Sequence, residues 1–400
     1  MVMKKVFSNS TVNGTVLFVL LSVAAVSCKK NSNTPVQSPG VIKEPLVLEC
    51  DDPISNGGTL VNDPDRPVDY RVNCQLALNG DVTIEPGTVI EFATDAGFKI
   101  TKNGSLASNG NSSTPVELTG VDKTKGSWSG VIFDSDDTKN KLIYTNISYA
   151  GGKPFNSNGD HGAVIIWSGT RVTLQNCNIT NAMHYGLNAN YHGANITLEN
   201  NSFKGNDVPM HLNGSLLSVP SSSDDYTGNE KDVVELRFYT STISNAATWH
   251  KINVPYLTKG ATNLVINADV TIEPGTDIMM GQGTGIKVNE KGGLKILGTA
   301  SAPITFRGEH ETPGAWAGIG YHFTANPINE VGHARIMHAG ANMKGAIYMW
   351  AKPVLKVHNV AFSDLKTCAM YAAPSTSSPN TNLGHSNNTY VSVGGQICGD

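Results

Sequence analysis

Short runs of alternating apolar and polar residues recur along most of the chain. Residues 82–84 (Val-Thr-Ile) and 116–118 (Val-Glu-Leu) are two examples. Such alternation places successive side chains on opposite faces of a strand, and no long stretch shows the apolar spacing of a helix. Turns rich in Gly, Pro and Asn separate the runs, and Pro86 and Gly87 suit the two central positions of a tight turn. The pattern predicts an all-β protein.

A short repeat lies inside the first part of the chain. The positions Val172, Leu174, Asn176 and Ile179 are followed, at an offset of 24, by Ile196, Leu198, Asn200 and Phe203. A period of this order indicates a solenoid or a propeller, but propeller blades need about 40–50 residues. Three short strands in each turn are what a right-handed parallel β-helix requires. We therefore predict this solenoid, with apolar side chains stacked inside the coil and asparagines stacked at its bends.

A longer repeat shows that the chain is duplicated. Residues 81–88 (Asp-Val-Thr-Ile-Glu-Pro-Gly-Thr) recur unchanged at 269–276, an offset of 188. The match continues without a gap to Gly130 and Gly318. We predict a solenoid built from two homologous halves. The expected parts are a first half at 46–214, a connecting segment at 215–232 and a second half at 233–400.

The first residues have the pattern of a secretion signal. Two lysines precede an apolar run at 16–26, which is too short to span a bilayer and fits a signal peptide. The run ends in Ala-Val-Ser before Cys28, which resembles a bacterial lipobox. The resemblance implies cleavage before Cys28 and lipidation of that residue. We expect a lipoprotein signal peptide at 1–27 and a proline-containing tether at 28–45.

Composition narrows the set of partners. The charged fraction of 16% is low, which argues against a disordered chain and against a long coiled coil. The net charge of -4 provides no broad basic surface, so we expect no nucleic-acid partner. The expected partners are a membrane, reached through the lipid anchor, and a polysaccharide or surface glycan. The expected localisation is the outer membrane, with the protein facing the periplasm or the cell surface.

Three motifs occur in both halves and resemble those of a known group of proteins. They are Thr-Ile-Glu-Pro-Gly-Thr at 83–88 and 271–276, Gly-x-Leu at 104–106 and 292–294, and Trp-x-Gly at 128–130 and 316–318. In these motifs the chain resembles bacterial, Bacteroidetes-like secreted lipoproteins with right-handed parallel β-helix repeats, which share the pectate-lyase-like architecture. The resemblance implies the fold but no single activity, because this coil carries lyases, hydrolases, adhesins and binding proteins.

Cysteine usage indicates an oxidising compartment. Cys50 and Cys74 lie near the start of the first half, and Cys368 and Cys398 bracket the C-terminal region. These four are the candidates for disulfide bonds, and the sequence leaves their pairing open. Cys177 aligns with an apolar position of the second half, and we interpret it as a buried free thiol.

Few residues suggest catalysis. A polysaccharide lyase needs a base and a positive group, and its common form adds calcium held by acidic side chains. The candidate residues are Asp134, Asp136, Asp137 and Arg171, with Asp160 and His161 as a further acid–imidazole pair. A solvated acidic loop is the alternative interpretation. No spacing typical of a metal site is present, so we expect no metal and no cofactor apart from calcium in the lyase alternative.

Tryptophans are the candidates for ligand binding. Trp128 and Trp316 precede a glycine by two residues in both halves, and we interpret their recurrence as packing. Trp167 and Trp350 close alternating runs beside loops that differ in length between the halves. Variable loops often carry binding sites, and an aromatic ring can stack on a sugar. We predict a glycan site near Trp167 and Trp350, with core packing as the alternative.

Three functions are consistent with these observations. The preferred one is a membrane-anchored β-helix lipoprotein of the cell envelope that binds glycans or mediates adhesion. The second is a polysaccharide lyase acting on a uronate-containing polymer, and the third is a structural envelope protein without a ligand. Whether the protein is an enzyme is left open. A panel of acidic and neutral polysaccharides, tested for binding and for cleavage, separates the three.

Overall fold

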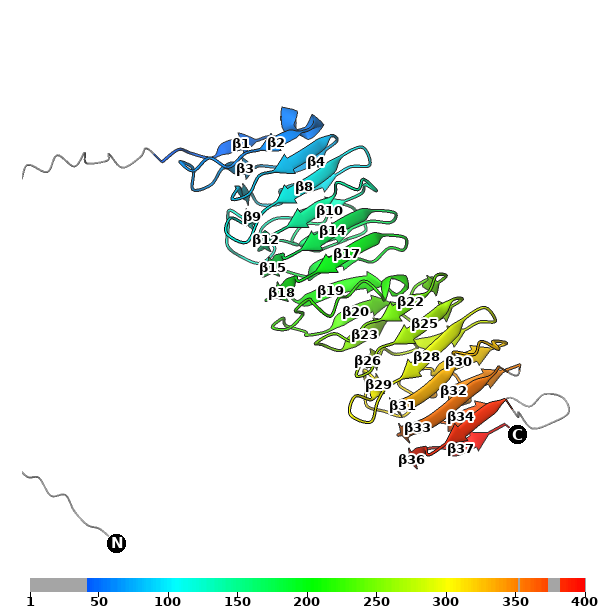
Figure 1. Ribbon diagram of the computed structural model, residues 1–400. Coiled ribbons are helices and arrows are strands. Elements are labelled where there is room, and N and C mark those ends of the chain that lie inside the picture. The colour runs from blue at the N-terminus through cyan, green and yellow to red at the C-terminus, as the bar shows by residue number, and fades with distance from the viewer. Residues whose placement is uncertain (1–41, 352, 373–381, 400) are drawn as a thin grey trace, which may run out of the picture. The chain divides into compact units, whose positions relative to one another are not determined.

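The described residues form a β-solenoid of about 14 turns (Figure 1). The computed structural model describes residues 42–351, 353–372 and 382–399. Strands account for 46% of the residues and helices for 2%, and the strand ladders are parallel. The predicted all-β solenoid is therefore confirmed. The predicted signal peptide, Cys28 and most of the predicted tether lie outside the described residues.

Three parallel ladders form the first half, and successive strands of the chain visit them in turn. One contains β1 (Leu46–Leu48), β3 (Tyr70–Val72), β6 (Val89–Phe92), β9 (Val116–Gly120), β12 (Thr145–Ser148), β15 (Asn178–Thr180) and β18 (Ser202–Lys204). The next contains β2 (Gly58–Leu60), β5 (Asp81–Ile84), β8 (Ser105–Asn109), β11 (Lys141–Ile143), β14 (Arg171–Gln175) and β17 (Asn195–Glu199). The β13 ladder contains β4 (Gln75–Leu78), β7 (Gly97–Ile100), β10 (Gly130–Phe133), β13 (Val164–Ile166), β16 (Tyr185–Ala189) and β19 (Val208–Asn213).

The second half has three ladders as well. The first begins with β20 (Val234–Arg237), β23 (Tyr256–Lys259), β26 (Asp277–Met280) and β29 (Ile304–Gly308), and the second with β22 (Ala247–Trp249), β25 (Asp269–Ile272) and β28 (Gly293–Leu297). The long strands β31 (Glu330–Met337) and β33 (Leu355–Ser363) belong to both ladders. Their C-terminal parts continue the first ladder to β36 (Thr389–Val391), and their N-terminal parts continue the second to β35 (Leu383–Ser386). The β32 ladder contains β21 (Thr242–Ile243), β24 (Asn263–Ile266), β27 (Gly285–Val288), β30 (Ile319–His322), β32 (Gly345–Trp350), β34 (Cys368–Ala372) and β37 (Gly395–Cys398). Two short 3-10 helices, η1 (Pro53–Asn56) and η2 (Gly214–Leu216), complete the described elements.

Alternation along each strand divides core from surface. In the β13 ladder the inward positions form a buried apolar column of Phe98, Val131, Val164, Leu187 and Met210. Parallel strands lie about 4.8 Å apart, so these side chains stack in direct contact. The outward positions of the same strands are Lys99, Ile132, Ile165, Asn188 and His211. This outward column belongs to the candidate site described below.

The two halves are joined with a shift of one face. β7 and β27 are equivalent strands of the repeat, as are β6 and β26, because the offset of 188 relates their bounds. However, the β13 ladder, which contains β7, continues through β19 and β20 to β23 and then to β26. β27 instead belongs to the β32 ladder. A face of the first half therefore continues as a non-equivalent face of the second half, and we call this the one-face shift.

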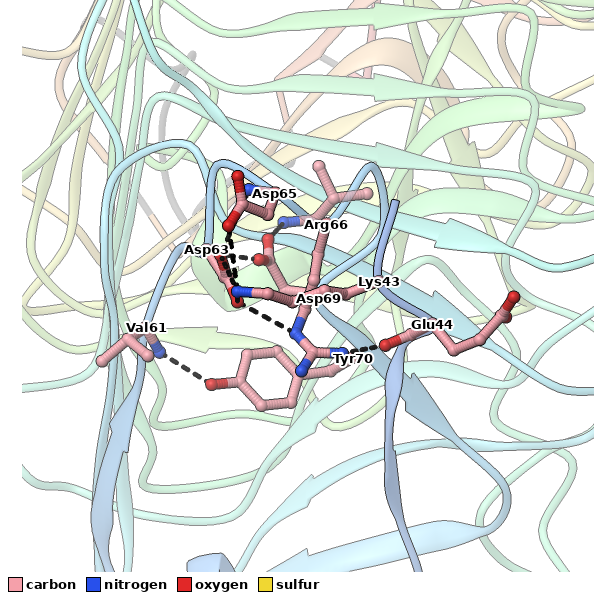
Figure 2. A network of polar contacts seen from close by, with 9 residues as sticks. Lys43, Glu44, Val61, Asp63, Asp65, Arg66, Asp69 and Tyr70 are labelled. Atoms are coloured by element: carbon pink, nitrogen blue, oxygen red, sulfur yellow. Dashed lines mark hydrogen bonds and ion pairs between the residues drawn. The ribbon is translucent and has the colours of Figure 1, made fainter. Parts of the chain in front are cut away.

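A network of charges closes the N-terminal end of the solenoid (Figure 2). The Lys43 ammonium lies 3.0 Å from a carboxylate oxygen of Asp63 and 3.0 Å from one of Asp65. Arg66 donates to Asp63 at 3.1 Å and also to the backbone oxygen of Glu44. These contacts tie the strand that enters the solenoid to the 61–69 segment, which lies between β2 and β3.

The disulfide predictions are confirmed, and the structure supplies the pairing. Cys50 is bonded to Cys74 directly after β1 and β3, and Cys368 is bonded to Cys398 between β34 and β37. Each bond joins neighbouring turns near one end of the described solenoid. Cys177 is buried and forms no disulfide bond, as predicted, and burial raises the pKa of its thiol to about 12.

Asparagine amides bond between neighbouring turns as expected at Asn206, whose Nδ2 donates to Asn229 Oδ1 at 3.0 Å, but not at the predicted pair Asn176 and Asn200. Asn176 and Asn200 adopt left-handed backbone conformations, with φ of 54° and 55°, which asparagine tolerates better than most residues. The bonds between turns are made by the following residue, Asn201, whose Oδ1 accepts from the Cys177 backbone N–H at 3.0 Å. Asn201 N–H in turn donates to Asp224 Oδ1 at 2.7 Å. Buried amides and one buried carboxyl thus connect three successive turns.

Candidate functional site

Trp167 lies at the outward face of the β13 ladder, directly after β13. Its backbone N–H donates to the Phe133 oxygen at 3.1 Å, which continues the pairing with β10. The indole ring is half-buried, and the Lys99 ammonium lies 5.7 Å from its centroid. The ring borders a hollow of about 400 Å³, which we call the Trp167 hollow. Its lining residues are Lys102, Asp134, Asn156, Asn158, Trp167, Ser168 and Tyr191.

Three buried polar atoms on this face lack partners within the described chain. They are the indole Nε1 of Trp167 and the side-chain Oδ1 atoms of Asn188 and Asn190. Asn188 is paired with Ile165 across β16 and β13, and Trp167 and Asn190 each lie two residues beyond that pair. A buried donor or acceptor without a partner costs free energy unless water or a ligand satisfies it. Of the three residues only Trp167 lines the hollow, so its Nε1 is the donor nearest to a molecule bound there.

The 151–162 loop covers the β13 ladder beside the hollow. The loop is anchored at Asp160, whose carboxylate accepts from Asn156 Nδ2 at 2.7 Å and from the Tyr191 hydroxyl at 2.9 Å. Burial and this hydrogen bond raise the pKa of Tyr191. At the other side, a Cβ on Gly97 would come within 2.7 Å of the Phe155 ring, so glycine is needed there for the loop to lie flat.

Cover by the 151–162 loop explains an exception to the alternating pattern. Ile132 and Ile165 are outward residues, yet both are buried, and neither belongs to the core cluster inside the coil. Trp167 shares their face, as the alternation predicted, but lies at the edge of the loop and remains partly accessible. The sequence missed Tyr191, which lies one turn of the solenoid beyond Trp167, at an offset of 24.

The predicted acidic cluster is divided among different contacts. Asp134 and Asp136 line a second hollow of about 240 Å³ together with Lys102 and residues 168–170, next to the Trp167 hollow. Asp137 instead accepts from the Lys139 backbone N–H at 2.8 Å. Among the described residues, no group of three or more His, Cys, Asp or Glu side chains is arranged to hold a metal ion.

Two further pairs of candidate residues are not joined by any contact between their side chains in the described chain. Arg171 is exposed at the start of β14 and forms no ion pair with Asp136. Asp160 bonds to Asn156 and Tyr191, whereas His161 Nδ1 contacts the backbone oxygen of Gly152 at 2.7 Å. This acid and this imidazole therefore bond to different groups.

Trp350 lies on a different face from Trp167. It ends β32, opposite His322 of β30, and 47% of its surface is exposed. The β13 ladder does not continue into the β32 ladder because of the one-face shift, so the two tryptophans do not form one site. The sequence also missed Tyr348, whose ring lies 6.3 Å from that of Trp350 with nearly parallel planes. Alternation within β32 was the available signal, since the two residues are two positions apart.

Trp128 and Trp316 pack in the core, as their recurrence predicted. Both are fully buried. The Trp128 ring is stacked on Phe92 at 4.1 Å, and its Nε1 donates to the Ser148 oxygen at 2.8 Å. Trp316 donates to the Met337 oxygen at 2.7 Å. These rings stabilise the turns and are not available to a ligand.

Comparisons with known proteins identify no relative of this chain. No protein-family model matches the chain, and neither the curated proteins nor the solved structures contain a match to it.

Proposed function

We propose that the protein binds a glycan in the Trp167 hollow. The observation that carries the proposal is the half-buried indole ring of Trp167 at the lining of the hollow, with its buried Nε1 unpartnered within the described chain. Sugars present alternating apolar patches and hydroxyl groups, so they match a ring surrounded by donors and acceptors. Asn156, Asn158 and Asp134 supply further polar groups at the lining of the hollow.

Binding at one such site is expected to be weak. Stacking on one aromatic ring contributes about 1 kcal/mol, and each neutral hydrogen bond adds a similar amount. Open hollows of this kind bury only part of a sugar. Adhesion to a polymer with many identical sugars would compensate, because several proteins in one membrane can bind the same chain.

The test is a panel of neutral and acidic polysaccharides presented to the full chain in detergent micelles. Trp167→Ala should weaken binding about tenfold, because it removes the stacking ring and one donor. For a neutral polymer, Trp350→Ala is the matched control on another face and should retain binding. The circular dichroism spectrum shows whether both variants keep the fold. Unchanged affinity of the folded Trp167→Ala variant would place the site elsewhere.

A polysaccharide lyase is the second candidate function. The hollow lined by Asp134, Asp136 and Lys102 adjoins the Trp167 hollow, so a bound polymer would pass two carboxylates and one amine. A lyase would release an unsaturated product that absorbs in the ultraviolet, and Asp136→Asn would abolish it. Binding of a polysaccharide without release of a product that absorbs in the ultraviolet supports the binding function. If no polysaccharide of the panel is bound, the structural envelope protein remains.

We further propose that lipidation at Cys28 anchors the protein in the outer membrane. Support comes from the signal-like segment before Cys28. Among the described residues, no helix is both long enough and apolar enough to cross a bilayer. Cys28→Ala should release the protein from the membrane fraction and prevent incorporation of labelled palmitate. Continued palmitate incorporation in the variant would contradict lipidation at this residue. Protease treatment of intact cells distinguishes a surface-facing from a periplasmic protein.

A further inference from the structure

We propose that the second half carries a separate binding surface for an acidic glycan, on the outward face of the β32 ladder. It is formed by Lys287, His322, Lys344, Tyr348, Trp350 and Tyr371 and is called the aromatic platform below. The proposal rests on the proposed function only in that both ligands are glycans. The location, the chemistry of the ligand and the test are different.

Aromatic side chains from three neighbouring turns meet on this face. The register of the ladder places Tyr348 opposite Tyr371, and their ring centroids are 5.4 Å apart with planes inclined by 23°. Trp350 is stacked on the other side of Tyr348 at 6.3 Å and 19°. The His322 ring lies 5.8 Å from Tyr348. The rings form a continuous group, of which Trp350 is the most exposed member.

The charges around the rings are positive. Lys287 occupies the same outward column as Tyr348, separated from it only by Gly320. The Lys344 ammonium lies 5.1 Å from the centroid of the Tyr371 ring and 3.3 Å from its hydroxyl oxygen. Within the described chain, neither lysine forms an ion pair with a carboxylate, unlike Lys259, which lies 2.8 Å from Glu309. Two unpaired amines beside stacked rings favour a sugar that carries an anionic group.

Gly320 gives His322 access to the platform. A Cβ at position 320 would lie 2.7 Å from His322 Nε2, so the imidazole occupies the space that a side chain would fill. His322 is therefore held between Lys287 and Tyr348. Burial, followed by the positive charge of Lys287, lowers the pKa of His322, so the ring is neutral at pH 7. A neutral imidazole adds a hydrogen-bonding group without further charge.

The platform and the Trp167 hollow cannot serve one straight polymer as equivalent sites. The one-face shift continues the β13 ladder into β26, whereas the platform begins from β27, the next strand of the same turn and a different face. The chemistry differs as well, because the hollow is lined by a carboxylate, Asp134, together with Lys102 and two amides, whereas the two platform lysines form no ion pair among the described residues. The geometry therefore points to simultaneous binding of two separate glycan chains, one of them acidic.

The experiment measures binding of the full chain, in detergent micelles, to dextran sulfate, polygalacturonate and neutral dextran. Trp350→Ala should weaken binding of the acidic polymers about tenfold, and the Lys287→Gln, Lys344→Gln double variant by a similar factor. Preference for dextran sulfate or for polygalacturonate identifies sulfate or carboxylate as the anionic group. The Lys251→Gln, Lys356→Gln double variant, which removes two exposed amines outside the strands of the β32 ladder, is the matched control for loss of two positive charges.

Each outcome is decisive for the platform. Wild-type affinity for the acidic polymers in both platform variants overturns the proposal. An equal loss in the Lys251→Gln, Lys356→Gln control also overturns it, since binding would then follow net charge alone. Trp167→Ala should leave acidic-polymer binding unchanged, and loss there would assign the acidic glycan to the hollow instead. If the hollow binds nothing while the platform variants lose affinity, the proposed function fails and this inference stands.

Discussion

The buried carboxyl of Asp224, at the junction of the halves, should make the stability of the protein depend on pH. Removing this carboxyl should abolish that dependence. Only 4% of Asp224 is exposed. Its Oδ1 accepts from Asn201 N–H at 2.7 Å, and its Oδ2 accepts from the Tyr226 hydroxyl at 3.0 Å. Burial outweighs these bonds and raises the pKa of Asp224 from 3.8 to about 6. The native state therefore holds this proton more tightly than the unfolded chain does.

The sign and size of the effect follow from this difference. A carboxyl whose pKa is raised on folding contributes stability below its unfolded pKa, and the contribution is lost as the pH rises through the folded pKa. A shift from 3.8 to about 6, at about 1.36 kcal/mol for each pH unit, corresponds to about 3 kcal/mol. Wild type should lose this amount between about pH 4 and pH 7.

Asp224→Asn isolates the contribution, because the amide does not titrate. Its Oδ1 can still accept from Asn201, but its NH2 cannot accept from the Tyr226 hydroxyl, so the hydrogen bond that Tyr226 donates, worth about 1 kcal/mol, is lost. We expect the variant to be about 1 kcal/mol less stable than wild type at pH 4 and about 2 kcal/mol more stable at pH 7.

Urea unfolding of wild type and variant, followed by tryptophan fluorescence from pH 4 to pH 8, measures the difference. Hydrogen exchange of the 199–229 peptides reports the same change locally, which guards against independent unfolding of solenoid turns. Asp51→Asn, at an exposed position, controls for the removal of one carboxylate. A difference between Asp224→Asn and wild type that does not vary with pH, or that reverses in sign, would refute the reasoning.

Three further predictions concern packing and reactivity. Gly97→Ala should destabilise the protein by about 1–3 kcal/mol in urea unfolding, because its Cβ meets the Phe155 ring and a backbone oxygen at 2.7 and 2.6 Å; Gly384→Ala, whose Cβ meets nothing closer than 3.9 Å, should change stability little. Trp128→Ala should cost about 3–5 kcal/mol, and a loss below about 1 kcal/mol would show that its stacking is not structural. Cys177, with its pKa raised to about 12, should resist iodoacetamide at pH 8 until the protein is unfolded, as mass spectrometry can show.

The sequence predicts this fold well because the solenoid is made from local repetition. Each turn contacts only its neighbours, so the short repeat at 172–203 and the alternation in 82–84 already contain the geometry of the coil. The same locality explains why Trp128 was correctly placed in the core. A ring kept in both copies, beside a glycine with φ of 111° at position 130, belongs to the shared scaffold.

Features that depend on the register between unequal turns could not be predicted. Tyr348 lies opposite Tyr371 on the following turn and opposite Gly320 on the preceding one. More residues separate Tyr348 from Gly320 along the chain than separate it from Tyr371. No single offset therefore identifies the aromatic column. The one-face shift arises in the connecting segment, where the repeat is interrupted. Asp160 and His161 illustrate a different limit, since adjacency in sequence does not bring two side chains into contact.

The N-terminal charge network and the first disulfide also determine how the molecule would respond to a mechanical load. Tension applied through the chain before Lys43 reaches β1, which among the described residues is paired with β3 alone. The Lys43 ion pairs would break first, and β1 would then separate from β3 one hydrogen bond at a time. The covalent bond between Cys50 and Cys74 follows immediately after both strands. Unzipping would stop there, so the load would pass into the second turn through a covalent bond while the turns beyond it stay folded.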